Sequence, residues 1–279
     1  MNKEAVNTMH DIPLGKQTEY VSVYTPSLLC PIPREESRRS LSIDEQALPF
    51  SGVDIWTGYE LSWLDAKGKP VVAMAEFIFP CFSPAIVESK SFKLYLNSFN
   101  QTRFNSMQEV ATTLESDLSV AAGAKVLVDV QSLNQGVSRG LGHLVGESID
   151  GQDIEVDVYH PDASLLACDE GRIISENLHS DLLKSNCPVT GQPDWASVYI
   201  AYRGPAIDKA ALLRYIVSFR EHQDFHEHCV ERMFTDIKAQ CKPEQLTVYA
   251  RYTRRGGLDI NPFRTDCGDS ALDIRLARQ

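Results

Sequence analysis

A short motif that recurs within the chain constrains its fold more strongly than any other feature of the sequence. Tyr95-x-x-Ser98-Phe99 returns as Tyr215-x-x-Ser218-Phe219, and 215 minus 95 gives an offset of 120 positions. The same offset aligns Glu88 with Asp208. Around both copies, apolar residues recur at the i, i+3, i+4 and i+7 spacing of one helical face. The repeat therefore predicts two modules of similar fold, produced by a duplication.

The first module is predicted at residues 48–165, after an N-terminal arm at residues 1–47, with the element order β-β-α-α-β-β. A turn signal at 66–69 indicates that its first two strands form a hairpin. Ser89 or Ser91 is expected to cap the first helix, as serines commonly do. The strands are expected at 54–63, 71–79, about 125–133 and 154–159. The helices are expected from just after Glu88 to Phe99 and from the capping box Ser106-x-x-Glu109 onward.

The second module, residues 166–279, is predicted to repeat this order after a connection near 163–171. Its first strand is expected to end near Cys187, its second and third strands to cover 195–203 and 246–252, and its fourth strand to begin at 258. Its helices are expected at 208–220 and at about 226–240. Each of the four helices is expected to bury one apolar face. These faces comprise Phe92, Tyr95, Leu96 and Phe99; Met107, Val110, Ala111, Leu114 and Leu118; Leu212, Tyr215, Ile216 and Phe219; and Cys229, Val230, Met233, Phe234 and Ile237.

Composition and charge narrow the functional class. A hydrophobic fraction of 43% and a charged fraction of 23% are those of a soluble globular protein. The net charge of −11 argues against a nucleic-acid surface, which is usually basic. No apolar run is long enough to span a membrane, and no signal peptide is recognisable, so we expect a cytoplasmic protein. The seven cysteines are scattered without a CxxC pair, which disfavours a disulfide framework and a structural zinc site.

Cys187 and Asp194 form the first candidate constellation. Cys187 lies in a loop marked by proline and glycine, and Asp194 stands seven positions later where a strand begins. A thiolate that attacks and an acid that delivers a proton are what nucleophilic catalysis requires. The alternative is a small buried hydrophobic cysteine, which is the commoner role of a free cysteine.

Three further groups have both a structural and a functional interpretation. Glu88 precedes a helix, so it is either a capping carboxylate or a bidentate acceptor for the N–H edge of a heterocycle. His226 shares an apolar helix face, so it is either a core histidine or a proton-transfer group, while the spacing of His226, His228 and Cys229 disfavours a metal site. Arg251, Arg254 and Arg255 before Gly256-Gly257 are either solvated charges or, with Lys90 and Lys93, a phosphate-binding cluster.

These residues carry a resemblance to a known family. Glu88-Ser89-Lys90-Ser91-Phe92-Lys93-Leu94-Tyr95 resembles the signature of the NADPH-dependent 7-cyano-7-deazaguanine reductases (QueF), the nitrile reductases of queuosine biosynthesis in tRNA modification. The resemblance is to the long, two-module form and covers roughly residues 48–263. It extends through Cys187-Pro188-x-Thr190-Gly191-Gln192-Pro193-Asp194, Phe225-His226-Glu227 and Tyr252-Thr253-Arg254-Arg255-Gly256-Gly257.

The resemblance implies an α+β fold of tandem tunnelling-fold (T-fold) modules, each a four-stranded antiparallel sheet with two helices. It also implies a homodimer whose sheets join into a barrel, a deazapurine substrate and NADPH as cofactor. No metal, nucleic acid or membrane is expected to take part. The alternatives are another T-fold purine or pterin enzyme, such as a GTP cyclohydrolase-like protein, and a non-catalytic purine-binding module.

Residue roles follow from the same resemblance. Cys187 is expected to add to the nitrile carbon and form a covalent thioimide, Asp194 to protonate the nitrogen, and His226 to assist proton transfer. The product would be 7-aminomethyl-7-deazaguanine. The residues expected to bind substrate are Val87, Glu88, Ser89, His226 and Glu227, and those expected to bind NADPH are Ser89, Lys90, Arg255 and Gly256.

Overall fold

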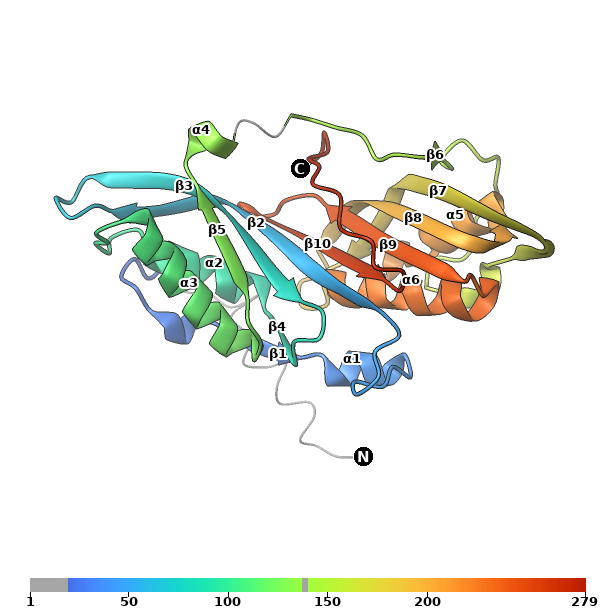
Figure 1. Cartoon of the computed structure of the whole chain (residues 1–279), viewed down its shortest axis with the longest axis horizontal. Helices are drawn as coiled ribbons and strands as arrows, with labels where there is room; N and C mark the ends of the chain where they lie inside the picture. The colour runs from blue at the N-terminus through green and yellow to red at the C-terminus, as the bar shows by residue number, and fades with distance from the viewer. Residues whose placement is uncertain (1–19, 137–139) are drawn as a thin grey trace. The chain divides into compact units, whose positions relative to one another are not determined.

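Long antiparallel strands and amphipathic helices make up the part of the chain that the structure, a computed structural model, describes: residues 20–136 and 140–279 (Figure 1). The α+β class expected from the sequence is confirmed. The chain divides into two compact units. The first unit comprises the described parts of Met1–Arg34 and Trp56–Ser138 together with Arg255–Leu258, and the second comprises Glu35–Ile55, Arg139–Arg254 and Asp259–Gln279.

The first unit is built on the hairpin of β2 (Ser51–Leu64) and β3 (Pro70–Pro80), as predicted. Strand β5 (Leu127–Gln131) pairs antiparallel with β3. Helices α2 (Ser89–Ser98) and α3 (Met107–Ala122) lie against one face of these strands (Figure 1). The shorter elements are η2 (Pro26–Leu28), β1 (Pro31–Pro33), which pairs with β4 (Ala85–Val87), and α4 (Leu133–Gly136).

Helix α2 forms where the apolar period predicts it. Phe92, Tyr95 and Phe99 are fully buried, and Phe92 packs edge-on against Phe77 with ring centroids 4.9 Å apart. The predicted serine cap is wrong, because Glu88 is the N-cap: its side chain accepts from the backbone N–H groups of Lys90 and Ser91. A glutamate whose two oxygens reach two N–H groups replaces the single bond that a serine would accept.

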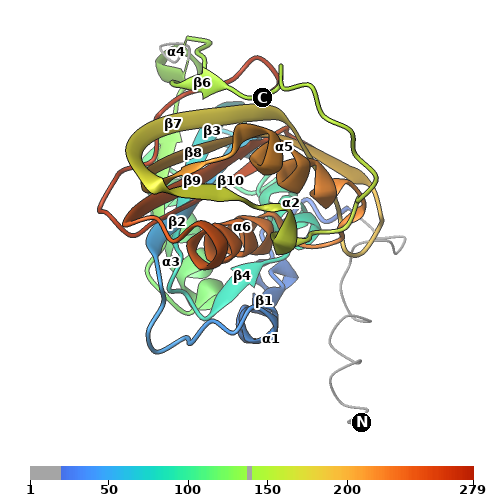
Figure 2. The ribbon, with the colours of Figure 1, turned by 90° about the vertical axis from the view of Figure 1, so that its right-hand side faces the viewer.

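The second unit follows the predicted order of its elements. Strands β7 (Cys168–Asn186), β8 (Pro193–Ile207), β9 (Gln245–Tyr252) and β10 (Leu258–Thr265) form an antiparallel sheet, to which β6 (Glu147–Ser148) adds in parallel. Helices α5 (Lys209–Ser218) and α6 (His226–Cys241) lie against one face of this sheet (Figure 2). The shorter elements are α1 (Glu35–Ser40), η3 (Ala163–Leu165) and η4 (Phe219–Glu221).

The opposite face of this sheet is covered by chain without regular structure. Tyr199, Tyr249 and Phe263 form an apolar cluster there with Leu144 and Leu276. Both leucines come from coil segments, one before β6 and one near the end of the chain. The sheet is therefore buried on both sides at β9 and β10, whereas β7 keeps many exposed polar residues.

The repeated motif does the same structural work in both units. The hydroxyl of Tyr95 donates to Asp117 Oδ2, and that of Tyr215 donates to Asp236 Oδ2, each at 2.7 Å. The serine three positions later donates to the carbonyl oxygen of its tyrosine at 2.6 Å in both copies. Asp208, the counterpart of Glu88, caps α5 by accepting from Ala211 N–H. The two copies of the repeat therefore share side-chain hydrogen bonds as well as residue identities.

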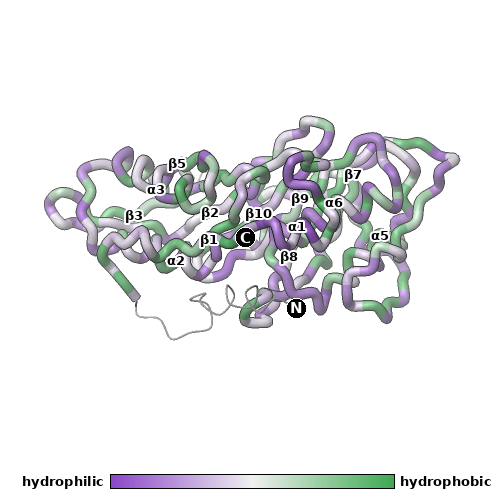
Figure 3. The backbone as a smooth tube through the Cα atoms, turned by 90° about the horizontal axis from the view of Figure 1, so that it is seen from below, coloured by the Kyte–Doolittle hydropathy of each residue, from purple (hydrophilic) through white to green (hydrophobic). Residues whose placement is uncertain are grey.

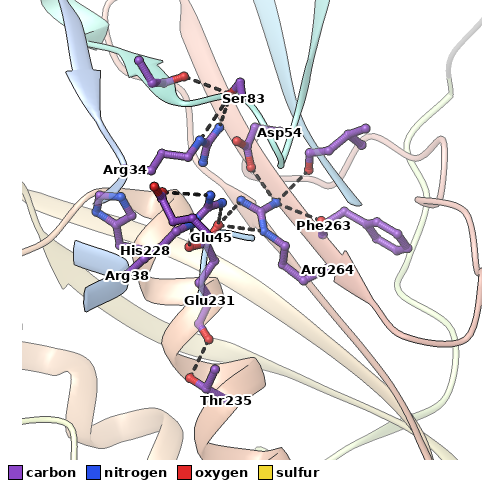
Figure 4. A network of polar contacts seen from close by, with 12 residues as sticks. Arg34, Arg38, Glu45, Asp54, Ser83, His228, Glu231, Thr235, Phe263 and Arg264 are labelled. Carbon is purple, nitrogen blue, oxygen red and sulfur yellow. Dashed lines mark hydrogen bonds and ion pairs between the residues drawn. The ribbon is translucent and has the colours of Figure 1, made fainter. Parts of the chain in front are cut away.

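A buried ion-pair network joins residues of four elements, α1, β2, α6 and β10 (Figure 4). Glu231 of α6 accepts from Arg38 of α1 and from Arg264 of β10, at 2.8 and 2.9 Å to Oε1. Arg264 also donates to Asp54 at 2.7 Å. All four side chains are buried, so each charge depends on its partners rather than on water.

Two expectations for the connecting segments are wrong. Residues 154–159 form no strand, although their side chains alternate in burial. The segment runs instead beside α5 and η4, where Arg214 donates to Glu155 O and Glu221 N–H donates to Tyr159 O. Alternation there reflects packing of one side on helices, which period-2 patterning does not distinguish from a strand.

The N-terminal arm is the second such segment. The polar, proline-containing sequence of the arm predicts an extended segment, but residues 20–47 contain the short helices η2 and α1 beside the strand β1. Residues 1–19 of the predicted arm lie outside the described residues. Within the described residues, no helix is both long and apolar enough to cross a lipid bilayer. The hydropathy colouring agrees, because hydrophilic and hydrophobic residues are mixed along the helices (Figure 3).

Candidate active site

Cys187 opens the loop that joins β7 to β8. Its N–H donates to Gln192 O at 2.9 Å and its carbonyl oxygen accepts from Gly191 N–H at 3.0 Å, so the loop is closed on the cysteine. Gly191 has a φ of +66°, a left-handed conformation that glycine adopts without strain. The Cys187 side chain is buried, with 6% of its surface exposed. The sequence therefore builds a rigid turn that holds the thiol in a shielded position.

The strand before this loop is held by the segment that leads into α6. Asn186 N–H donates to His222 O at 2.8 Å, and Asp224 N–H donates to Asn186 O at 3.2 Å. The Asp224 carboxylate lies between His222 and His228, at 3.5 and 3.1 Å. Burial by itself raises the pKa of Asp224, but hydrogen bonds from both histidines and from Phe225 N–H outweigh it and hold the pKa below its ordinary value.

Asp194 and His226 meet beside the Cys187 loop. Asp194 is the second residue of β8 and lies opposite Ser185 of β7, two residues before the cysteine. Its carboxylate Oδ2 lies 3.4 Å from Nε2 of His226, the first residue of α6. Both side chains are shielded, at 3% and 12% exposure. The hairpin register and the start of α6 together bring the Asp194 carboxylate and the His226 imidazole into contact, beside the loop that carries the buried Cys187.

Two other predicted residues of the second unit have different outcomes. Glu227, in the first turn of α6, is buried at 2% exposure, which is unusual for a carboxylate. Arg251 is not part of an exposed arginine cluster: it is buried and donates to Gln279 Oε1 at 2.8 Å and to the Tyr249 hydroxyl at 2.6 Å. Because side chains alternate between the two faces of β9, the Arg251 side chain packs on one face of the sheet and does not join Arg254 and Arg255 in the β9–β10 loop.

Sequence reasoning missed Tyr252 as a site residue. Its ring is stacked on the His226 imidazole, with centroids 3.6 Å apart and an interplanar angle of 2°. Its hydroxyl is buried near Ser185 and Cys229. Burial raises the pKa of the Cys229 thiol far above its ordinary value, so this second cysteine stays neutral. Tyr252 stands in a motif of the resemblance, but no spacing rule links residue 252 to residue 226.

The predicted residues of the first unit centre on the start of α2. Glu88 is fully buried, and its N–H donates to Cys30 O at 2.9 Å. Its two carboxylate oxygens accept from Lys90 N–H at 2.8 Å and from Ser91 N–H at 2.7 Å. Burial raises the pKa of Glu88, and these hydrogen bonds and the Lys90 charge oppose that rise. The capping interpretation is thus confirmed. The Ser89 side chain adds a third hydrogen bond, which leaves the carboxylate about one further acceptor position for a ligand.

Val87, Ser89 and Lys90 flank this carboxylate, Val87 buried and the other two half-buried. Arg255 and Gly256 belong to the β9–β10 turn, which is closed by hydrogen bonds between Arg255 and Leu258 in both directions. Gly256 and Gly257 have φ values of +59° and +80°. The Lys93 ammonium donates to Gly256 O and to Glu60, so a cation from α2 rests on the turn.

The residues of the two units therefore suit two different tasks, a covalent reaction and the binding of an anion. In the second unit, Cys187, Asp194, His226 and Glu227 suit covalent addition coupled to proton transfer. In the first unit, Lys90, Lys93 and the glycine turn suit an anion such as phosphate. Among residues 20–136 and 140–279, no three metal-ligating side chains gather closely enough to hold a metal ion. The two nearby histidines face different carboxylates, His226 facing Asp194 and His228 facing Asp224.

Comparison with known proteins covers the whole length of the chain. Residues 20–130 match the family "Nitrile reductase, 7-cyano-7-deazaguanine-reductase N-term", and residues 193–270 match the family "QueF-like protein". The NADPH-dependent 7-cyano-7-deazaguanine reductase of Bordetella avium (strain 197N) is 60% identical over 97% of this chain and 99% of its own length. The enzyme of that name from Chromobacterium violaceum is 55% identical over 100% of both chains. The apo crystal structure of the archaeosine synthase QueF-Like matches 35% of this chain and 95% of that chain, with 18% identity and a TM-score of 0.30, too low to bear on the fold.

Proposed function

The chain belongs to the family of NADPH-dependent 7-cyano-7-deazaguanine reductases, and from that premise we propose that it reduces the nitrile of 7-cyano-7-deazaguanine to the aminomethyl group in queuosine biosynthesis. The observation that carries the proposal is identity of 60% and 55% along the full length of two such enzymes. The shielded set of Cys187, Asp194 and His226 in the second unit supports it independently.

The first step is covalent addition by Cys187. Its sulfur forms a bond to the nitrile carbon, one π bond of the nitrile breaks, and that electron pair passes to nitrogen, which takes up a proton. Asp194 is the proposed proton donor, and His226, at 3.4 Å from its carboxylate, is placed to support that transfer. The resulting thioimide accepts a hydride more readily than a nitrile does, because its C=N carbon is more electrophilic.

Reduction to the amine takes four electrons. NADPH, when bound, supplies them as two hydrides in successive rounds. Between the rounds Cys187 leaves as thiolate and frees an imine. Burial of Cys187 and Asp194 favours exclusion of water, which would otherwise hydrolyse the imine.

Base and cofactor recognition are assigned to the remaining residues. Glu88 and Glu227, with backbone groups of Val87 and Ser89 and the His226 ring, are proposed to bind the deazaguanine base. A carboxylate matches the paired N–H donors of such a base. Ser89, Lys90, Arg255 and Gly256 are proposed to bind NADPH. Exposure of Gly256 and the nearby Lys93 charge support this role, since phosphate groups favour free N–H groups and cations.

Intact-mass spectrometry after mixing the protein with 7-cyano-7-deazaguanine, without NADPH, tests the function directly. Addition across the nitrile releases nothing, so the expected product is one chain heavier by the full mass of one substrate. Cys187→Ala should give no adduct and no substrate-dependent NADPH oxidation, yet still bind the base. Cys267→Ala, which alters a half-buried cysteine outside the proposed site, should form the adduct normally. A wild-type protein with neither adduct nor NADPH oxidation would contradict the proposal and favour a purine-binding module.

The finer architecture is also a proposal. We infer T-fold modules at residues 48–165 and 166–279 and a homodimer whose sheets join into a barrel. The duplicated Tyr–Asp hydrogen bonds support two related modules. The strands of each unit, over the residues that the structure describes, form an open sheet, so a barrel requires a second copy. Light scattering should give twice the chain mass of 31.2 kDa, and a monomer mass would contradict the assembly.

A further inference from the structure

The His226 imidazole has an unusually well-defined neighbour in Tyr252. The two rings are parallel within 2°, and their centroids are 3.6 Å apart, so the rings are in van der Waals contact. Such a stack fixes the plane of the imidazole while leaving its two nitrogens free in that plane. Nε2 points at Asp194. Nδ1 is buried and has no hydrogen-bond partner among the residues that the structure describes. A functional histidine is usually oriented by a hydrogen bond to its other ring nitrogen, and here the stack on Tyr252 takes the place of that bond.

The sheet register sets where the Tyr252 ring lies. Tyr252 of β9 is paired with Ala196 of β8, and Asp194 is two residues earlier on the same strand. Side chains two residues apart on a strand share a face, so Asp194 and Tyr252 project to the same side of the sheet. The backbone of Tyr252 is held at both ends: its N–H donates to Asn261 Oδ1, and its carbonyl oxygen accepts from Gln279 Nε2, each at 3.1 Å.

The hydroxyl group of Tyr252 does not account for this placement. Burial raises its pKa well above the ordinary value, and the neighbouring Cys229 and Asp194 raise it further. The phenol therefore keeps its proton at any working pH and is a poor general acid. It also makes no hydrogen bond of good geometry within the described part of the chain. What the site uses is the flat ring.

We propose that Tyr252 is the positioning residue of the reductase site: its ring holds His226 in the plane in which Nε2 faces Asp194. This inference rests on the proposed function, because it gives His226 and Asp194 their joint role in protonating the nitrile nitrogen. Without the ring, the imidazole is free to rotate about its side-chain bonds, and the proton path to Asp194 is open only part of the time. Misplacement of about 1 Å can slow a reaction by about 100-fold.

Two substitutions separate the ring from the hydroxyl. Tyr252→Phe keeps the ring and should form the thioimide within about threefold of the wild-type rate. Tyr252→Leu removes the ring and should slow thioimide formation by about 10- to 100-fold, a larger loss than the loss of base affinity, because His226 is only one of several proposed base contacts. Rescue by phenylalanine marks a stacking role. A Tyr252→Leu protein with the wild-type rate, or a Tyr252→Phe protein as slow as the leucine variant, would overturn the proposal.

A double substitution tests that the effect passes through His226. On a His226→Ala background, Tyr252→Leu should cause no further loss in the rate of thioimide formation, because the group it positions is gone. An equal loss on both backgrounds would mean that Tyr252 acts elsewhere, and it would refute the proposal.

NMR of histidine-labelled protein keeps the test valid if Tyr252→Leu fails to fold. The His226 ring protons, assigned by their loss in His226→Ala, should be shifted upfield by the stacked ring in wild type and in Tyr252→Phe. Unshifted protons in the wild type would overturn the proposal. This readout needs no turnover, so its failure is distinct from failure of the proposed function, which would appear as a wild-type protein that forms no adduct.

Discussion

Nε2 of His226 lies 3.4 Å from Oδ2 of Asp194, and neither side chain has more than 12% of its surface exposed. An imidazole and a carboxylate shielded in this way can share a proton that bulk water does not readily exchange. The pair is brought together by two separate parts of the sequence: the β7–β8 hairpin carries the aspartate, and the start of α6 carries the histidine.

Asp194→Asn should separate proton delivery from binding. Asparagine keeps the shape and can still face His226, but it has no proton to give. We expect thioimide formation to slow by about 10²- to 10⁴-fold, with base affinity changed by less than about threefold. Time-resolved intact-mass measurements would give the rate. Asp153→Asn, an exposed aspartate in a loop, is the matched control and should behave as wild type. An Asp194→Asn protein that reacts at the normal rate would remove this residue from the mechanism.

Glu88→Gln should raise the unfolding free energy relative to wild type as pH rises, and it should weaken binding of the base. The folded-state pKa of Glu88 is raised, chiefly by burial, so its contribution to stability is present below the ordinary pKa and lost as pH rises through the folded value. The unfolding free energy of Glu88→Gln, relative to wild type, should therefore increase from pH 4 to pH 7.5. Affinity for the base should fall by about tenfold or more, because a charged acceptor is lost. Urea unfolding at both pH values checks the first expectation, and titration with the base checks the second.

The control for that measurement is Asp208→Asn. Asp208 caps α5 as Glu88 caps α2, but its side chain is exposed. Its substitution should change stability by a similar amount at both pH values and leave base affinity unaltered. If Glu88→Gln shows no pH-dependent difference from wild type, burial of this carboxylate is not destabilising the folded state at neutral pH.

The duplicated tyrosines should not be equally important. Tyr215→Phe removes the hydroxyl bonded to Asp236, a carboxylate whose pKa is raised by burial, and should destabilise the protein by about 1–3 kcal/mol. Tyr95→Phe should be milder, since Asp117 still accepts from the Tyr24 hydroxyl at 2.6 Å. Urea unfolding of the two variants compares them. A larger loss for Tyr95→Phe would contradict this ranking.

Glu231→Ala should be among the most destabilising single changes outside the site. It leaves the buried guanidinium groups of Arg38 and Arg264 without their shared carboxylate, and breaking such a buried pair costs about 3–5 kcal/mol. Glu35→Ala removes an exposed pair with Arg39 and should cost less than about 1 kcal/mol. Thermal unfolding distinguishes the two. Similar melting temperatures for both variants would show that the network in Figure 4 adds little.

Gly257→Ala should disturb the turn that carries Arg255 and Gly256. A Cβ at residue 257 would lie 2.5 Å from the carboxyl carbon of Glu60, and the backbone there has a φ of +80°. We expect a loss of stability of about 1–2 kcal/mol from the left-handed conformation alone, and a raised KM for NADPH with little change in base affinity. Gly151→Ala, where a Cβ would meet nothing within 4 Å, is the control. An unchanged KM for NADPH would argue against a cofactor role for this turn.

The elements built from local periodicity were predictable from the sequence. The hairpin of β2 and β3, the four helices and their apolar faces follow from spacing that any neighbouring surface would satisfy, and nearly all of the predicted face residues are buried. The exceptions, Met107 and Ala111, lie at the edge of the α3 face and are half-buried. The strand expected at 154–159 was wrong, because its alternation reflects contact with α5 and η4 rather than pairing with a strand.

The sequence by itself determined the family, the repeat and the identities of the candidate nucleophile and acid, since these depend on residue types at fixed spacings. Only the tertiary structure decided that Glu88 caps its own helix, that Arg251 is buried, and that Tyr252 stacks on His226. Each of these depends on atoms from segments that meet after folding or on the direction in which a side chain leaves the backbone. Linear spacing carries information about one helix or strand. Packing of the whole unit sets the register between β8 and β9 and the position of α6 against the sheet.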